Sequence, residues 1–104
     1  MTITTWLNDR AASPPPRLAA RIEEALANYG ALPRDEAPAR CIDAAEALLS
    51  ELLAHGSSGR ESALDLLTVD ALVTYAFEAA SDQPEWLARR ADDAMRRLAA
   101  IARE

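Results

Sequence analysis

Three polar residues recur at four-residue steps in the most apolar stretch of the sequence. Asp70, Thr74 and Glu78 lie within the run 63–80, where most other residues are apolar. Because residues i, i+4 and i+8 of a helix lie above one another, the three side chains would form one polar stripe. Two carboxylates on such a stripe could bind a cation or a basic group, or share a proton at raised pKa. We therefore take Asp70, Thr74 and Glu78 as candidate binding residues.

A simpler interpretation is that this stripe is the solvent-facing side of an otherwise buried helix. Asp70 would then also interact with the positive end of the helix dipole. The two carboxylates, eight residues apart, would be about 12 Å apart along the helix. That separation is too large for one metal ion without ligands from other helices. Both interpretations stay open, and the binding interpretation requires further carboxylates from the preceding helix.

The other reactive side chains do not assemble into a catalytic or metal-binding set. Glu51 and His55 have the i, i+4 spacing of two metal ligands, but His55 is the single histidine and is expected to end a helix. Cys41, the single cysteine, would lie about four turns from His55 on that helix. The two cannot then form a catalytic pair. We predict no catalytic residues, no metal and no cofactor, and favour a protein that is not an enzyme.

Four arginines near the carboxyl end are interleaved with acidic residues. Asp92 with Arg96 and Asp93 with Arg97 have the acid-first i, i+4 spacing that stabilises a helix. A solvent-exposed face that neutralises itself is the expected result. A nucleic-acid site is the least favoured alternative, because the net charge of −6 is opposite to the basic surface such a site needs.

The composition is that of a small acidic protein. Its 104 residues, half of them hydrophobic, are enough for a single helical domain, 1–104, with one core. No uncharged apolar run approaches the roughly 20 residues that cross a bilayer, and the first residues lack the pattern of a secretory signal. A single cysteine can form no disulfide within the chain. We therefore expect a cytoplasmic protein that does not associate with membranes.

Hydrophobic periodicity predicts an all-α fold, a compact bundle of four main helices with a short N-terminal helical arm. Apolar residues recur at helical spacing in four segments, and strand-like alternation of useful length is missing. The first helix is expected over 15–29, and the second ends at His55, followed by Gly56. The third covers 63–80, and the fourth begins near Pro84.

Local signals at the ends of these helices give further expectations. Gly30 has the position of a left-handed helix cap, and Thr68 is a candidate N-cap that would interrupt the third helix. Ser58 and Glu61 have capping-box spacing. Since the connection 57–62 is short, the second and third helices should be antiparallel.

The N-terminal arm supplies candidate docking residues. Ile3, Trp6 and Leu7 have the spacing of one amphipathic helical turn, and a proline-rich segment without periodicity follows. We therefore expect residues 1–13 to be loosely attached. Tryptophan is common among interface anchors, so Ile3, Trp6 and Leu7 could dock a partner or a second copy. The alternative is that Trp6 covers one end of the bundle.

The pattern as a whole favours an interaction protein. The third helix, which has the least polar surface, should be the one most enclosed by its neighbours. Apolar helical surface is abundant, and no catalytic set accompanies it. The favoured function is protein–protein interaction in an adaptor or regulatory role, with a homodimer as one form. The alternative is a ligand- or metal-binding bundle, or a small enzyme, that uses the polar stripe.

Overall fold

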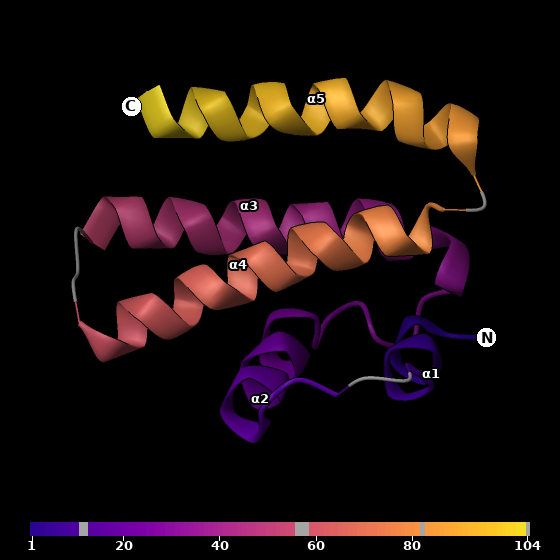
Figure 1. The fold of residues 1–104 in the computed structure, drawn as a ribbon, viewed down its shortest axis with the longest axis horizontal. Coiled ribbons are helices and arrows are strands. Elements are labelled where there is room, and N and C mark those ends of the chain that lie inside the picture. Colours follow the sequence, from indigo (N-terminus) through magenta and orange to yellow (C-terminus); the bar gives the residue numbers. More distant parts are fainter. Residues whose placement is uncertain (11–12, 56–58, 82, 104) are drawn as a thin grey trace.

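The protein is built from helices joined by turns. A computed structural model describes residues 1–10, 13–55, 59–81 and 83–103, and within these residues the regular elements are helical apart from one isolated bridge between Thr2 and Pro33 (Figure 1). The all-α prediction with four long helices is confirmed. The elements are α1 (Ile3–Asn8), α2 (Pro16–Ala25), the 3-10 turn η1 (Arg34–Glu36), α3 (Ala37–His55), α4 (Arg60–Ala79) and α5 (Pro84–Arg103).

The helices lie in three layers (Figure 1). The middle layer is the α3–α4 hairpin, whose helices are antiparallel as predicted from their short connection. Helix α5 lies on one side of this hairpin and runs parallel to α3, whereas α1 and α2 lie on the other side. The molecule measures 37 × 31 × 22 Å along its principal axes.

The core lies between α3 and its neighbours and consists largely of small side chains. Alanine, cysteine and isoleucine line the buried face of α3, and Leu72, Tyr75 and Ala76 face the same core from α4. Small side chains let helices approach closely, so each buried atom gains more contacts. Leu72 and Tyr75 are buried, as expected for the centre of the third helix, and Phe77 is half-buried.

The most enclosed helix is nevertheless not α4. Among the described residues α3 buries seven and α4 buries six, and α4 leaves Leu66 and Leu67 more than half exposed. The reason is position, because α3 lies between α4 and α5 whereas α4 has little contact with α5. Low polarity of a sequence segment therefore did not identify the helix with the most neighbours.

Two expectations about the first long helix are wrong. Helix α2 ends at Ala25 rather than at residue 29, and residues 26–32 form turns. Gly30 does not have the left-handed backbone of a helix cap. A Cβ atom at Gly30 would clash with Oγ1 of Thr4, and the Thr4 N–H donates to the Gly30 carbonyl at 3.1 Å. A side chain at position 30 would thus force the Thr4 hydroxyl to move.

The predicted interruption of the third helix is also wrong, because α4 is continuous from Arg60 to Ala79. Thr68 is fully buried, and its Oγ1 donates to the Leu64 carbonyl at 2.8 Å. A threonine hydroxyl that bonds to the preceding turn is satisfied inside a helix and does not need to cap one. The N-cap of α4 is Gly59, and the proposed capping-box residue Ser58, like Gly56, lies outside the described residues.

The N-terminal segment is attached more firmly than expected. Ile3 is fully buried, and its N–H donates to the Leu32 carbonyl at 3.0 Å. The Arg34 N–H donates to the Met1 carbonyl at 2.9 Å. These bonds join residues 1–4 to the turn before α3. The loose attachment predicted for residues 1–13 therefore does not describe residues 1–10.

Candidate functional site

The polar stripe lies on the surface of α4. Asp70, Thr74 and Glu78 are all exposed. Thr74 Oγ1 donates to the backbone carbonyl of Asp70 at 2.9 Å, and the Glu78 carboxylate accepts a hydrogen bond from Arg10. The arrangement matches the solvent-facing interpretation of the stripe, and a binding role for these residues stays a prediction.

Arg10 connects the N-terminal segment to α4. Its guanidinium lies 4.1 Å from the centre of the Tyr75 ring and 5.6 Å from the Trp6 ring, and it forms an ion pair with Glu78. Trp6 and Tyr75 meet edge to face, with ring centres 6.2 Å apart. The pKa of Arg10 is raised, chiefly by its hydrogen bond to Glu78. We call these four residues the Arg10 clasp.

The candidate docking residues of the arm contribute to this internal packing. Ile3 is fully buried, and Trp6 and Leu7 are half-buried against the main core. Trp6 therefore packs against the core and the Tyr75 ring, and Ile3 could meet a partner only if α1 moved. A docking role for Ile3, Trp6 and Leu7 stays a prediction.

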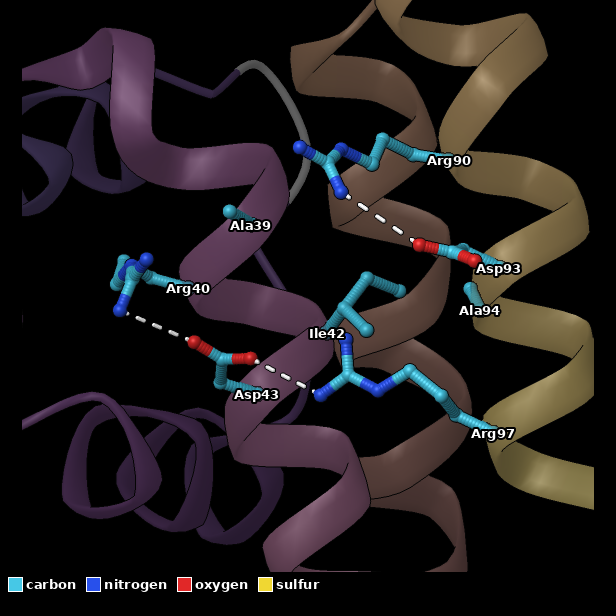
Figure 2. Close-up of a pocket in the computed structure, with 8 residues that line it drawn as sticks. All are labelled: Ala39, Arg40, Ile42, Asp43, Arg90, Asp93, Ala94 and Arg97. Carbon is cyan, nitrogen blue, oxygen red and sulfur yellow. Dashed lines mark hydrogen bonds and ion pairs between the residues drawn. The ribbon is translucent and has the colours of Figure 1, made fainter. Parts of the chain in front are cut away.

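A cleft of about 190 Å³ lies between α3 and α5 (Figure 2). At the centre of the cleft, Ile42 projects from α3 toward α5, and Ala94 of α5 faces Ile42. Charged side chains from both helices surround these two apolar residues. The lining residues are Ala39, Arg40, Ile42, Asp43, Arg90, Asp93, Ala94 and Arg97.

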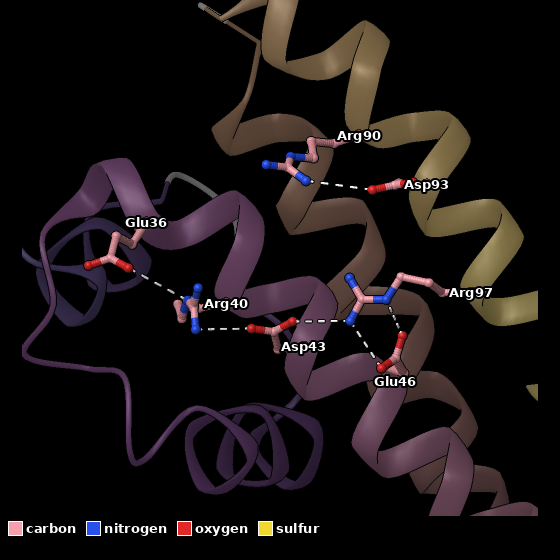
Figure 3. A network of polar contacts seen from close by, with 7 residues as sticks. All are labelled: Glu36, Arg40, Asp43, Glu46, Arg90, Asp93 and Arg97. Atoms are coloured by element: carbon pink, nitrogen blue, oxygen red, sulfur yellow. Dashed lines mark hydrogen bonds and ion pairs between the residues drawn. The ribbon is translucent and has the colours of Figure 1, made fainter.

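A chain of ion pairs crosses from α5 to α3 beside this cleft (Figure 3). Arg97 contacts Glu46 at 2.6 Å and Asp43 at 3.3 Å. Asp43 also forms an ion pair with Arg40 at 3.1 Å, and Arg40 lies 3.7 Å from Glu36. The pKa of Arg97 is raised, first by its hydrogen bond to Glu46 and further by Asp43. Arg97 is therefore the main polar attachment of α5.

Sequence spacing missed this role of Arg97. The expected partner, Asp93, instead forms an ion pair with Arg90 at 3.5 Å, whereas the predicted pair of Asp92 with Arg96 is present at 3.8 Å. The prediction of a fully self-neutralised face is thus wrong for Arg97. One available signal was that Arg97 directly precedes Leu98 at the edge of the apolar face, where a charge can reach a neighbouring helix.

Large apolar side chains are exposed on the three longest helices. Apart from Met1, those more than half exposed among the described residues are Leu53 (51%), Leu66 (55%), Leu67 (56%) and Met95 (63%). Helix α5 is covered on one side only. Ala94 is the one buried residue among its described side chains, and Leu87, Leu98 and Ile101 are half-buried.

Cys41 and His55 have structural positions. Cys41 is fully buried, and burial raises its thiol pKa to about 12, an effect that nearby Arg10 only partly opposes. His55 is the last residue of α3, as predicted, with Nδ1 2.8 Å from the Glu51 carbonyl. Within the part of the chain that the structure describes, no group of three or more histidine, cysteine or acidic residues could hold a metal ion.

The comparisons with known proteins give no relative. No protein-family model, curated protein or solved structure matches the chain. Along the described ranges, no helix has both the length and the apolar character that crossing a membrane requires. The class that the fold and surface define is therefore a small all-α protein with partly uncovered apolar helices.

Proposed function

We propose that this protein acts by protein–protein interaction, in an adaptor or regulatory role, through the apolar surface left uncovered on α4 and its neighbours. The observation that supports this most directly is the exposure of the adjacent residues Leu66 and Leu67. An isolated exposed leucine is ordinary. Each leucine side chain that a partner covered would contribute roughly 1.5–3 kcal/mol, so the two together would supply part of the binding free energy of an interface.

The polar stripe provides a rim for this surface. Leu66 and Leu67 precede Asp70 by four and three residues, so each leucine is a neighbour of Asp70 on the helix surface. Thr74 extends the exposed polar row by one turn. An apolar centre with a polar, solvent-accessible border is the usual anatomy of a protein interface. The candidate binding residues and the exposed leucines thus belong to one proposed surface.

A second copy of the chain is one partner that this proposal includes. We also infer a cytoplasmic location, which the single, buried cysteine supports. Nucleic acid and anionic membranes are not proposed as partners, because the net charge of −6 repels both.

The test compares the parent with a chain carrying Leu66→Ser and Leu67→Ser. Substitutions at exposed positions usually change stability by less than about 0.5 kcal/mol, so circular dichroism should show an unchanged helical signal. Light scattering over a concentration series measures self-association, and capture from native extract identifies proteins retained by the parent. We expect the double variant to lose the dimer or the retained partner.

The matched control is Ala20→Ser, an exposed substitution on α2. This control should behave as the parent in both measurements. A parent chain that stays monomeric and retains nothing would contradict the proposal. Equal binding by the parent and the double variant would exclude this surface as the interface.

A further inference from the structure

Helix α5 and the hairpin beneath it carry opposite charge. Helix α5 has five arginines and three acidic residues, whereas α3 and α4 together have seven acidic residues and two arginines. The net positive α5 therefore lies against α3, which has three acidic residues and one arginine and is itself net negative. The charged residues are Arg89, Arg90, Arg96, Arg97, Arg103, Glu85, Asp92 and Asp93 on α5, and Asp43, Glu46, Glu51, Glu61, Asp65, Asp70, Glu78, Arg40 and Arg60 on the hairpin.

The attachment of α5 to α3 depends on few contacts. Arg97 bridges to Asp43 and Glu46 (Figure 3), and Ala94 is the only buried side chain described on α5. The side chains of Arg97, Asp43 and Glu46 are 45%, 31% and 29% exposed. Ion pairs this exposed are weak and are screened by salt. The α5 helix is thus held to α3 by few apolar contacts together with complementary charge, and salt can weaken the second of these.

We propose that the α3 surface formed by Ile42, Asp43 and Glu46 is a docking site for an arginine-bearing amphipathic helix, and that α5 of a second copy can occupy it. We call this surface the α3 seat. Within one chain the seat is occupied by that chain's own α5. The partner's α5 has the same sequence and would make the same contacts, so the exchange replaces one set of contacts with an identical set.

The proposal goes beyond the proposed function, because it concerns a second surface, on α3, and names the helix that would bind there. Within a chain, the covalently linked α5 competes with any added helix for the α3 seat. Its effective concentration there is high, in the millimolar range for short linkers. A helix added from outside can therefore displace it efficiently only when the internal α5 is weakened. This requirement gives a direct test on the full-length chain.

The probe is a fluorescent peptide of residues 84–103, whose binding to full-length chains is followed by anisotropy. In the chain, Arg97→Ala removes the contact of the internal α5 with Asp43 and Glu46 but leaves the seat intact. The matched control is Arg96→Ala, because Arg96 pairs with Asp92 inside α5. We expect the peptide to bind the Arg97→Ala chain about tenfold more tightly than the parent or control chains, a difference of about 1.4 kcal/mol.

Two further measurements test whether the peptide binds at the α3 seat. Salt should weaken binding of the peptide to the Arg97→Ala chain. A chain that combines Arg97→Ala with Asp43→Asn and Glu46→Gln should lose that binding, although its own α5 is equally loosened. The proposal is overturned if the peptide binds all chains equally, if it binds none at millimolar concentration, or if the triple variant retains full affinity.

Folding and function remain distinguishable in this design. If Arg97→Ala lost its helical signal, Arg97→Gln would take its place. A second measurement needs no variant: amide hydrogen exchange in α5 of the parent chain should become faster as salt is added. Exchange unaffected by salt contradicts the proposal without any variant. Leu66 and Leu67 lie on α4, outside the seat. A negative peptide result would therefore leave the test of the proposed interaction surface unaffected.

Discussion

Cys41 illustrates a competition between two effects on one thiol. It lies in the second turn of α3, and the positive end of a helix dipole tends to lower a thiol pKa. Burial works in the opposite direction, because a thiolate without water is costly. Burial is the larger effect here and raises the pKa to about 12. Cys41 is therefore a packing residue in the folded protein.

Cys41 should react with a thiol reagent only after unfolding. At mildly alkaline pH we expect slow labelling of the native chain and rapid labelling in guanidinium chloride. Above the unfolded-state pKa of about 8.5, the unfolded chain releases the thiol proton while the folded chain keeps it. The free energy of unfolding should therefore fall with rising pH. A Cys41→Ala chain should lack this part of the decline, and an identical pH profile would contradict the assignment.

Two glycines should resist substitution for different reasons. Gly30→Ala places a methyl group against Thr4 Oγ1 and should lower the free energy of unfolding by about 1–3 kcal/mol. Adding Thr4→Ala should recover part of this loss, since it removes the clashing atom. Gly59→Ala should also destabilise the protein, because φ is 111° there, but Thr4→Ala should not rescue it. Chemical denaturation of the single and double variants measures how far Thr4→Ala restores the free energy of unfolding in each glycine variant.

At the scale of the element, α4 has one enclosed and one exposed side. Leu72→Ala removes a fully buried side chain and should lower the free energy of unfolding by about 2–5 kcal/mol. Leu66→Ala, on the same helix but 55% exposed, is the control and should change it little. Similar losses for the two variants in urea denaturation would show that the leucine at 66 is covered in solution.

The Arg10 clasp predicts unequal effects for the two carboxylates of the stripe. Glu78→Gln weakens the ion pair with Arg10 and should reduce stability by up to about 1 kcal/mol. Asp70→Asn, at an exposed site, should change stability by less than about 0.5 kcal/mol. Thermal unfolding across a pH series measures both. A pH-dependent effect of Asp70→Asn as large as that of Glu78→Gln would instead favour the alternative of a ligand-binding stripe.

At the scale of the whole molecule, stability should be unevenly distributed. The hairpin of α3 and α4 contains most of the buried residues, whereas α5 contributes one described buried side chain. Amide hydrogen exchange follows such differences in local burial. We expect the slowest exchange in the middle of α3 and α4 and the fastest helical exchange in α5. Equal protection of all three helices would contradict this order.

The parts of the fold that depend on local pattern could be predicted from the sequence. Helical periodicity gave the all-α class and four long helices, and the residues around His55 marked the end of α3. The roles of Gly30 and Arg97 depend instead on which segment lies beside them. Residue spacing along the chain cannot reveal a partner that lies tens of positions away.

Only those features of the candidate site that depend on local spacing could be predicted from the sequence. Spacing along one helix correctly placed Asp70 and Thr74 on a common face. It could not show that Glu78 pairs with Arg10, or that Arg97 reaches across to α3. Exposure of Leu66 and Leu67 was also missed, because an apolar run gives no information about which of its sides a neighbour covers.

The Arg10 clasp also has a consequence for the order of events during protein synthesis. Glu78 follows Arg10 by 68 residues, and ribosomes add about 5–20 residues per second. Helix α1 therefore emerges several seconds before the helix against which it is fixed. During that interval Trp6 lacks the Tyr75 ring that it meets edge to face in the folded protein, and its final position can be reached only when most of the chain has been translated.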